Sequence, residues 1–501
     1  MSAFHPAFDP ASAHPAAQWL VSANIRNVTA DSRAVDAACA FVAYPGVSAD
    51  GRKFIADAVK RGAAAILWDP EGGFTLADCP VPHLAVPDLK RQISRIAGDL
   101  FGRPSEDLLM VGVTGTNGKT STSTWIAESL TDCGRKAGVI GTLGAGFPGQ
   151  LIESGNTTPD AIVVQRSLAN LRAAGAEACA MEVSSHGLDQ HRVDGVKFTI
   201  ALFTNLTRDH LDYHGSMDAY GAAKAKLFSM PGLKHAVINI DDAFGQKLAL
   251  DCAKRGVRTL THGIGTGDIA AHIERMDGSG FELKVKTPRG DANIRSTLVG
   301  HFNVLNLLGV LGVLLAAGVP LPKAAEAAAA RRPVAGRMQV VGGPAARKPT
   351  VVIDYAHTPD ALEKALSALK PTVAAGHRLF CVFGCGGDRD RGKRPVMGEI
   401  ASRLANRVIV TSDNPRSEPA HQILDDIIAG MGGAGGADRL VIEDRRAAIF
   451  AALREAAPGD VVLIAGKGHE PYQDIKGVKH PFSDLAVAGE ALEKFASGGK
   501  A

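Results

Sequence analysis

The stretch Leu108–Leu130, LLMVGVTGTNGKTSTSTWIAESL, is the part of the chain that decides the fold. An apolar run leads into a glycine-rich turn, and the turn leads into a sequence typical of a helix. Glycines let successive backbone N–H groups point inward around phosphate oxygens, and the N-terminus of the helix adds partial positive charge. Lys119 would neutralise phosphate charge, and the Thr120 hydroxyl would bind Mg²⁺. The stretch therefore predicts a strand, a phosphate-binding loop and a helix.

The predicted loop departs in one respect from the common pattern G-x-x-x-x-G-K-[ST]. Val113 stands where that pattern has its first glycine, and the loop glycine is Gly115 instead. The alternative is an ordinary turn with a surface lysine, but the strand before it and the helix after it favour phosphate binding. We expect nucleotide phosphates to bind Thr114, Gly115, Thr116, Asn117, Gly118, Lys119 and Thr120.

The length of the chain, 501 residues, is too great for one core, and at roughly 100–200 residues per domain it predicts about three. Alternating strand-like and helix-like segments indicate an α/β protein throughout. We predict a small N-terminal α/β domain at 1–106, a central domain with a P-loop ATPase-like parallel sheet at 107–333, and a C-terminal Rossmann-like, doubly wound domain at 334–501.

Short apolar runs bounded by polar turns locate the strands of these domains. We predict strands at Ala40–Ala43, Ala63–Trp68, His83–Val86, Ala178–Val183, Thr199–Thr204, Ala236–Ile240, Thr350–Asp354, Arg378–Phe383, Arg407–Thr411 and Val461–Ile464. The uncharged run Leu307–Leu321 has 15 residues, too few to span a bilayer, and is predicted to be a buried helix.

The composition argues against nucleic-acid and membrane partners. Lys and Arg number 55 against 52 Asp and Glu, and aromatic residues make up only 5%, so neither a basic field nor base stacking is favoured. The seven cysteines are scattered and odd in number, which is not the pattern of a disulfide framework. We therefore expect a protein of the reducing cytoplasm without membrane insertion.

A phosphate loop alone leaves two classes of protein open: a switch or motor, and an enzyme that transfers phosphate to a substrate. A guanine-specific switch should carry an Asn/Thr-Lys-x-Asp base reader after a strand, and the sequence has none. The charge balance does not favour a motor on nucleic acid. Polar residues at predicted strand ends favour the enzyme.

Glu182 lies at the end of the predicted strand Ala178–Val183, and His210 follows the predicted strand Thr199–Thr204. A carboxylate and an imidazole at neighbouring strand ends are suited to hold a divalent metal near the terminal phosphate. The alternative is that the acidic residues Asp209 and Asp212 only cap the following helix. Lys224 and Lys226 lie on a predicted helix, and from composition alone we expect both to be ordinary lysines exposed to solvent.

The C-terminal domain carries four polar loops, each just past a predicted strand. They are Asp354–His357, Gly384–Asp390, Ser412–Arg416 and Gly466–Glu470. Four such loops at one edge of a sheet predict a binding rim, although any one of them is also consistent with an ordinary turn.

Taken together, these motifs resemble the Mur ligase family, ATP-dependent enzymes that form amide bonds in cell-wall precursors. TGTNGKTS, NTTPD, EVSSHGLDQHRV, TNLTRDHLDYHG, HFNVLN, GRMQVV, DYAHTPD and SDNPRSEP occur in the family's order across nearly the whole chain. Within the family, the motifs are most similar to those of the members that add meso-2,6-diaminopimelate to a UDP-N-acetylmuramoyl dipeptide during peptidoglycan synthesis. The resemblance implies a UDP-binding N-terminal domain, a central ATPase domain and a C-terminal domain that binds the amino acid.

The resemblance also implies a reaction. ATP phosphorylates the γ-carboxylate of the D-glutamyl residue, and the amine then attacks the acyl phosphate and releases phosphate, with Mg²⁺ offsetting the negative charge. It assigns catalysis to Lys119, Glu182, His210 and Lys224, and metal binding to Thr120, Glu182, His210 and Lys224. Lys224 matches the lysine that is carbamylated in the family, and only the resemblance separates it from Lys226.

Further binding residues follow from the family pattern. Besides the phosphate loop, ATP is implied at His301, Asn303, Asn306, Arg337 and Asp354. The UDP-linked substrate is implied at Ser32, Asn156, Thr157, Thr158, Ser184, Gln190 and Arg192. Diaminopimelate is implied at Arg389, Asp413, Asn414, Pro415, Arg416, Gly466 and Glu470.

Three other functions stay open on these residues. One is a sister ligase that adds L-lysine, another is a folylpolyglutamate synthase, which should lack DNPR and the first domain, and the third is a regulatory protein that kept only the ATP site. We expect small-molecule partners and a monomer. We also expect the central and C-terminal domains to move about a hinge near Arg332–Gly336, because the phosphate loop and the amine-binding loops lie in different domains.

Overall fold

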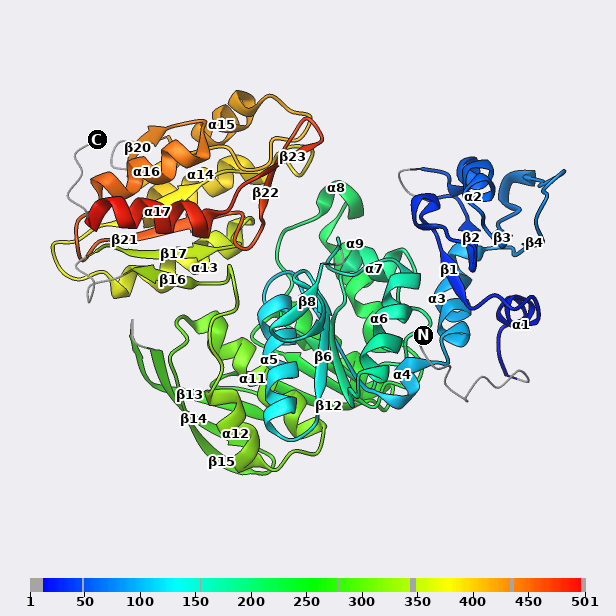
Figure 1. Cartoon of the computed structure of the whole chain (residues 1–501). Coiled ribbons are helices and arrows are strands. Elements are labelled where there is room, and N and C mark those ends of the chain that lie inside the picture. The colour runs from blue at the N-terminus through cyan, green and yellow to red at the C-terminus, as the bar shows by residue number, and fades with distance from the viewer. Residues whose placement is uncertain are drawn as a thin grey trace.

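The computed structural model describes residues 12–46, 49–153, 155–277, 280–342, 348–432 and 437–496. Figure 1 shows an N-terminal unit in blue, a central unit in cyan and green, and a C-terminal unit in yellow to red. Each unit is built around its own sheet, which confirms the predicted α/β fold with three domains.

The N-terminal sheet is small and wholly parallel. Its strands pair in chain order: β1 (Asn27–Thr29), β2 (Cys39–Ala43), β3 (Ala65–Trp68) and β4 (His83–Ala85). One face packs against α1 (Pro15–Ser22) and α3 (Leu89–Leu100), and the other against α2 (Ile55–Lys60). The short 3-10 helices η1 (Ser32–Ala34), η2 (Gly51–Phe54) and η3 (Glu71–Gly73) connect these elements.

The central sheet has eleven strands within the described residues, in the order β15-β14-β13-β12-β11-β10-β5-β9-β6-β7-β8. They are β5 (Leu109–Thr114), β6 (Ala137–Gly141), β7 (Gly144–Phe147), β8 (Gln150–Ile152), β9 (Ala178–Glu182), β10 (Ile200–Phe203), β11 (His235–Asn239), β12 (Arg258–Ile264), β13 (Ile269–Asp277), β14 (Gly280–Thr287) and β15 (Gly290–Ser296). The strands from β6 to β13 in this order pair in parallel, as predicted. The two ends of the sheet differ from the prediction, because β7, β8, β14 and β15 pair antiparallel.

Helices cover both faces of the central sheet. One face carries α5 (Lys119–Asp132), α11 (His301–Ala316) and α12 (Leu321–Ala329), and the other carries α6 (Ala161–Ala173), α7 (Ser185–Asp189) and α10 (Ala243–Lys254). α4 (Pro104–Asp107), α8 (Leu211–His214), α9 (Met217–Ala225) and η4 (Lys226–Ser229) complete the domain. The apolar run predicted as one buried helix is helical only as far as Ala316, where α11 ends, and its last residue, Leu321, begins α12. Within α11 the run is buried from Leu307 to Leu315, as predicted. Among the described residues, no helix has the length and apolar character needed to span a bilayer.

The C-terminal sheet is doubly wound, as predicted. Its order is β16-β17-β21-β18-β19-β20, with β16 (Gln339–Gly342) antiparallel at one edge and the parallel strands β17 (Thr350–Asp354), β18 (Leu379–Phe383), β19 (Arg407–Val410), β20 (Asp438–Val441) and β21 (Val461–Ala465). One face packs on α13 (Pro359–Leu369), α14 (Lys393–Leu404) and α15 (Ala420–Ala429), and the other on α16 (Arg445–Glu455) and α17 (Asp484–Ala496). η6 (Lys370–Thr372) follows α13, and a hairpin of β22 (Tyr472–Ile475) and β23 (Val478–Pro481) follows β21.

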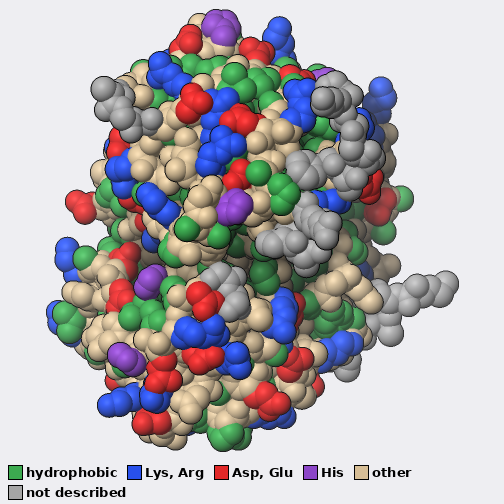
Figure 2. All heavy atoms as spheres, turned by 90° about the vertical axis from the view of Figure 1, so that its left-hand side faces the viewer, with side chains coloured by type: hydrophobic (Ala, Val, Ile, Leu, Met, Phe, Trp, Pro, Cys, Tyr) green, Lys and Arg blue, Asp and Glu red, His purple; other side chains and the backbone are tan. Residues whose placement is uncertain are grey.

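The surface charges agree with the near-neutral composition. On the face shown in Figure 2, basic and acidic side chains are interspersed, and neither sign forms a large continuous patch. The described side chains on this face therefore form no extended basic surface of the kind that binds a nucleic-acid backbone.

Candidate active site

The predicted phosphate loop connects β5 to α5, and its backbone conformation requires glycine at two positions. Gly115 and Gly118 have φ values of +151° and +85°. A Cβ atom at Gly115 would lie 1.9 Å from Thr204 Oγ1, and one at Gly118 would lie 2.5 Å from Asn306 Oδ1. Larger residues at these positions would therefore clash as well as strain the backbone.

Lys119 folds back over this loop. Its Nζ donates hydrogen bonds of 2.9 Å to the carbonyl oxygens of Gly115 and Thr116. Burial lowers the pKa of Lys119, because the charged form loses its hydration. The lysine is thus held at the loop, where added negative charge would stabilise its charged form.

Thr120 and Glu182 meet because β5 and β9 are paired with Val113 opposite Glu182. Thr120 Oγ1 donates to Glu182 Oε2 at 3.0 Å, and the backbone N–H of Thr142 donates to Oε1 at 2.9 Å. Glu182 is buried. A hydroxyl and a carboxylate beside a phosphate loop are oxygen donors that fit Mg²⁺, which takes one or two protein oxygens together with phosphate and water.

His210 does not complete a cluster of conventional metal ligands. Within the described residues, no three His, Cys, Asp or Glu side chains converge in a way that could hold a metal ion. His210 Nε2 lies 3.3 Å from Asp209 Oδ2, and the imidazole rings of His210 and His186 are 4.7 Å apart. Burial lowers the pKa of His210 to about 3, so the ring is neutral at physiological pH and able to bind a metal through nitrogen.

The structure distinguishes Lys224 from Lys226, which composition could not. Lys224 is buried on α9, its Nζ donates to Gly115 O at 2.8 Å, and it lies 4.1 Å from the centroid of the Tyr220 ring. Burial and the nearby charge of Lys119 hold the pKa of Lys224 well below its usual value. Lys226 instead makes a half-exposed ion pair with Asp189 at 2.8 Å.

A cavity of about 210 Å³ lies between the central and C-terminal domains, beside the phosphate loop. Of the residues predicted to bind ATP outside the loop, Asn303, Asn306, Arg337 and Asp354 line it. His301 does not line the cavity and is exposed at the start of α11. Arg337 reaches across from the C-terminal side and donates to Thr120 Oγ1 at 3.0 Å, while its buried Nε has no hydrogen-bond partner among the described residues. That free donor leaves Arg337 able to bind a further acceptor.

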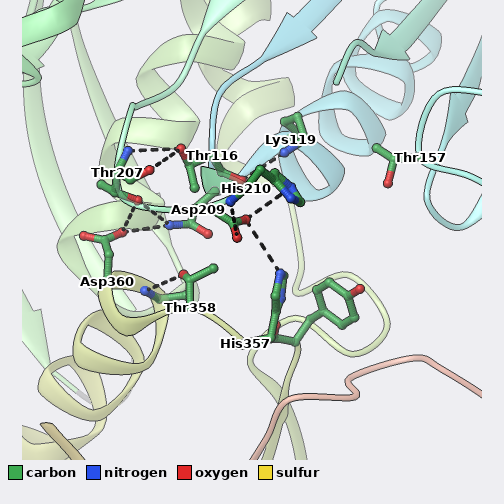
Figure 3. A network of polar contacts seen from close by, with 12 residues as sticks. Thr116, Lys119, Thr157, Thr207, Asp209, His210, His357, Thr358 and Asp360 are labelled. Atoms are coloured by element: carbon green, nitrogen blue, oxygen red, sulfur yellow. Dashed lines mark hydrogen bonds and ion pairs between the residues drawn. The ribbon is translucent and has the colours of Figure 1, made fainter. Parts of the chain in front are cut away.

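Further contacts between the two domains surround Asp360, at the start of α13 (Figure 3). Asn117 Nδ2 of the phosphate loop donates to Asp360 Oδ2 at 2.7 Å, and Thr207 Oγ1 lies 3.4 Å from the same oxygen.

A second contact between the domains joins His357 to Asp209, with His357 Nε2 3.9 Å from Asp209 Oδ2. Its Nδ1 is 2.8 Å from the carbonyl oxygen of Tyr355, which can only accept, so Nδ1 carries a proton.

A second cavity, of about 190 Å³, contains most of the residues predicted to bind the incoming amino acid. Arg389, Asp413, Asn414, Arg416, Gly466 and Glu470 all line it, whereas Pro415 belongs to the same loop but not to the lining. Asp209, His210, Tyr355 and His357 line both cavities. The phosphate loop and the predicted amine-binding loops are therefore connected through these four residues.

Lys467, for which the sequence predicted no function, is bonded to residues that line the second cavity. Its side chain is fully buried, and Nζ donates to Asn414 Oδ1 at 2.9 Å and to Glu470 Oε2 at 3.0 Å, with Asp413 Oδ1 at 3.7 Å. The only sequence signal for it is its place in the polar loop after β21. Lys467 holds three predicted binding residues together.

The residues predicted to bind the UDP-linked substrate fall into two places. Thr158 donates to Glu182 O at 2.9 Å and accepts from the N–H of Ser184 at 2.9 Å. Arg192 donates to Thr158 O at 2.6 Å and to Gln190 Oε1 at 2.7 Å. Thr157 lines the first cavity beside them and Asn156 is exposed, whereas Ser32 lies on η1 in the N-terminal domain.

We predict that Asp360→Ala weakens the association of the central and C-terminal domains. A hydrogen bond to a charged carboxylate contributes about 1.5–3 kcal/mol, and the variant loses the acceptor of Asn117 and Thr207. Small-angle scattering of the ligand-free protein should give a larger radius of gyration for the variant. Asp425→Ala, which removes an exposed carboxylate on α15, is the control, and equal profiles for both variants would contradict the prediction.

Comparisons with known proteins agree with this arrangement of domains. Three family models match successive parts of the chain: "Mur ligase family, catalytic domain" at 24–99, "Mur ligase middle domain" at 113–314 and "Mur ligase, glutamate ligase domain" at 336–468. Two UDP-N-acetylmuramoyl-L-alanyl-D-glutamate–2,6-diaminopimelate ligases, from Chromobacterium violaceum and Pseudomonas aeruginosa, are 55% and 50% identical to the chain. The matches cover 93% of this chain and 94% and 95% of the two relatives.

Solved structures of Mur ligases are similar to this chain over nearly its whole length. A structure of a UDP-N-acetylmuramoyl-L-alanyl-D-glutamate–2,6-diaminopimelate ligase matches with a TM-score of 0.65 and 36% identity, over 94% of this chain and 95% of that one. MurF from Acinetobacter baumannii matches with a TM-score of 0.67 over 95% and 98% of the two chains, but at 18% identity it supports the fold alone.

Proposed function

The chain belongs to the Mur ligase family and is therefore a ligase, and from this premise we propose the reaction it catalyses. It adds meso-2,6-diaminopimelate to the D-glutamyl γ-carboxylate of UDP-N-acetylmuramoyl-L-alanyl-D-glutamate, with conversion of ATP to ADP and phosphate, in peptidoglycan precursor synthesis. The observation that carries the proposal is that the cavity at the phosphate loop and the cavity lined by Asp413, Asn414 and Arg416 share four residues. The relatives named above support the choice of substrates.

In the proposed enzyme, each domain binds a different substrate. Residues 1–106 bind the UDP end of the substrate with Ser32, residues 107–333 bind ATP, and residues 334–501 bring the amino acid. Asn156, Thr157, Thr158, Ser184, Gln190 and Arg192 hold the peptide end near Glu182, which the contacts of Thr158 with Glu182 and Ser184 support.

Transfer of the terminal phosphate of ATP turns the γ-carboxylate, a poor electrophile, into an acyl phosphate with a good leaving group. Thr114–Thr120 hold the phosphates, with Lys119 countering their charge. Asn303, Asn306, Arg337 and Asp354 bind the rest of the nucleotide, and their place in the same cavity supports this. His301 has only the family pattern in its favour, since it lies outside that cavity.

The proposed enzyme also binds Mg²⁺ as its metal cofactor. Thr120 and Glu182 would hold one ion, and His210 with a carbamylated Lys224 would serve as further ligands. When bound, the ion offsets the crowding of negative charge between ATP and the carboxylate. The lowered pKa of Lys224 supports carbamylation, because the neutral amine is the form that combines with carbon dioxide.

The incoming amino acid binds in the second cavity, between Arg389, Asp413, Asn414, Arg416, Gly466 and Glu470, with Pro415 stiffening the loop. We further propose a monomer of the reducing cytoplasm that acts on small molecules. Seven free cysteines, with no disulfide between them, support that compartment.

The direct test supplies the protein with ATP, Mg²⁺, the UDP-muramoyl dipeptide and either meso-diaminopimelate or L-lysine. We expect a tripeptide product containing diaminopimelate, identified by mass, and little or none containing lysine. A protein that preferred lysine would be the sister ligase, and one that formed no amide with either amino acid would refute ligation.

We predict that Lys224→Ala lowers activity at least about 100-fold, since loss of groups that support a metal site already costs 10- to 100-fold. Formate or acetate should restore part of the activity by supplying an oxygen ligand. Lys226→Ala is the matched control, because Lys226 lies only two residues from Lys224 but makes a half-exposed ion pair with Asp189. Steady-state rates with saturating substrates check the prediction, and equal losses in the two variants would show the assignment to be wrong.

We predict that Arg416→Ala raises the KM for diaminopimelate steeply while the KM for ATP stays near normal. Diaminopimelate differs from lysine by a carboxylate at its far end, and a guanidinium can bind a carboxylate with two parallel hydrogen bonds. Loss of one partner from such a pair costs about 2–5 kcal/mol, which is roughly 30- to 4000-fold. Arg403→Ala, an exposed arginine paired with Glu399 and Glu363, is the control. Wild-type enzyme that used both amino acids equally well would contradict this account of Arg416.

A further inference from the structure

The hairpin β22–β23 packs directly against the loop Ser412–Arg416, which carries most of the predicted amino-acid-binding groups. The backbone N–H of Asp474 donates to Asn414 Oδ1 at 2.9 Å. Gln473 Nε2 donates to the carbonyl oxygen of Asp413 at 2.9 Å and lies 3.5 Å from that of Ser412. The loop is thus bonded at successive positions to one strand of the hairpin.

Arg416 itself is built into the edge of this hairpin. Its N–H donates to Asp474 O at 3.0 Å, and its carbonyl oxygen accepts from the N–H of Lys476 at 2.8 Å. These two bonds form a parallel bridge between Arg416 and Ile475. The backbone of Arg416 therefore has the same partners that a residue of an added strand would have.

This bridge holds Arg416 in a conformation that is unfavourable on its own. Its φ is +51°, in the left-handed region that residues with a Cβ atom seldom adopt. Such a conformation persists only where the surrounding structure over-determines it, and it is concentrated at ligand-binding positions. The hairpin supplies that constraint through Gln473, Asp474 and Lys476.

The constraint fixes the direction of the guanidinium. Arg416 Nη1 donates to Gly387 O at 2.6 Å, and the side chain lines the second cavity. Gly386 permits this approach, because a Cβ atom there would lie 2.8 Å from Nη1. One edge of the guanidinium is therefore anchored, and its direction depends on the backbone that the hairpin holds.

We propose that the hairpin β22–β23 determines amino-acid specificity by fixing Arg416, and that Gln473 is its positioning residue. This inference rests on the proposed function and deepens it. The ligand class is an amino acid whose side chain ends in a second carboxylate. Two parallel hydrogen bonds to that carboxylate require the guanidinium in one place. A shift of the loop therefore weakens the enzyme's discrimination between amino acids before it affects phosphate transfer in the other cavity.

The experiment compares Gln473→Ala and Gln473→Glu with wild type. Alanine removes the donor, and glutamate keeps the size but places an acceptor against the carbonyl oxygen of Asp413. We expect the KM for diaminopimelate to rise and the ratio of kcat/KM for diaminopimelate to that for lysine to fall, each about tenfold, from one lost hydrogen bond and a relaxed backbone. The KM for ATP should stay near that of wild type.

His480→Ala is the matched control, because His480 pairs with Gln473 across the hairpin and is exposed. It should leave the ratio and both KM values unchanged, and thermal unfolding of all variants checks that they are folded. A folded Gln473→Ala protein with the wild-type ratio would overturn the inference and would mean that the hairpin only covers the sheet. Wild-type enzyme that fails to select diaminopimelate would instead refute the proposed function, so the two failures are distinguishable.

Discussion

The parallel pairing of β5 with β9 is the constraint on which the site depends. It places Glu182 opposite Val113, so that the carboxylate lies beside the first turn of α5 and accepts from Thr120. Arg337, from the C-terminal side, donates to the same Thr120 hydroxyl. The Thr120 hydroxyl is therefore the point where the phosphate loop meets the end of a neighbouring strand and the C-terminal domain. The remaining polar groups are arranged around it.

Two lysines lie beside this point, the partly buried Lys119 and the buried Lys224. The carbonyl oxygen of Gly115 accepts from both Lys119 and Lys224, and burial lowers the pKa of each. Two ammonium groups so close together repel each other unless negative charge lies between them or one of them gives up its charge. A bound triphosphate would place negative charge beside Lys119. Lys224, which is buried on α9, is the lysine suited to giving up its charge.

Local patterns predict the parallel parts of the fold because such strands are buried on both faces and form continuous apolar runs, as Val461–Ala465 does. The antiparallel end of the central sheet follows another pattern: Phe281, Leu283 and Val285 are buried and alternate with Glu282, Lys284 and Lys286. That period of two indicates a strand, but its partners depend on the rest of the sheet. Contacts such as Asn117 with Asp360 join residues 243 positions apart, so sequence reasoning gave Asp360 no role.

Both cavities take walls from the central and C-terminal domains, since Asp209 and His210 line each of them, but the cavities differ in how their other polar groups are bonded. Lys467, Asn414 and Glu470 are bonded to one another inside the C-terminal domain, and the hairpin holds Arg416 from the same side. At the phosphate loop, by contrast, Arg337 and Asp360 are bonded to Thr120 and Asn117 of the central domain. A change in the relation of the two domains would therefore separate Arg337 and Asp360 from their partners, while the C-terminal groups proposed to bind the amino acid keep their bonds to one another. Binding to preorganised groups avoids the entropy cost of ordering them, so the C-terminal groups proposed to bind the amino acid are in place before the domains close.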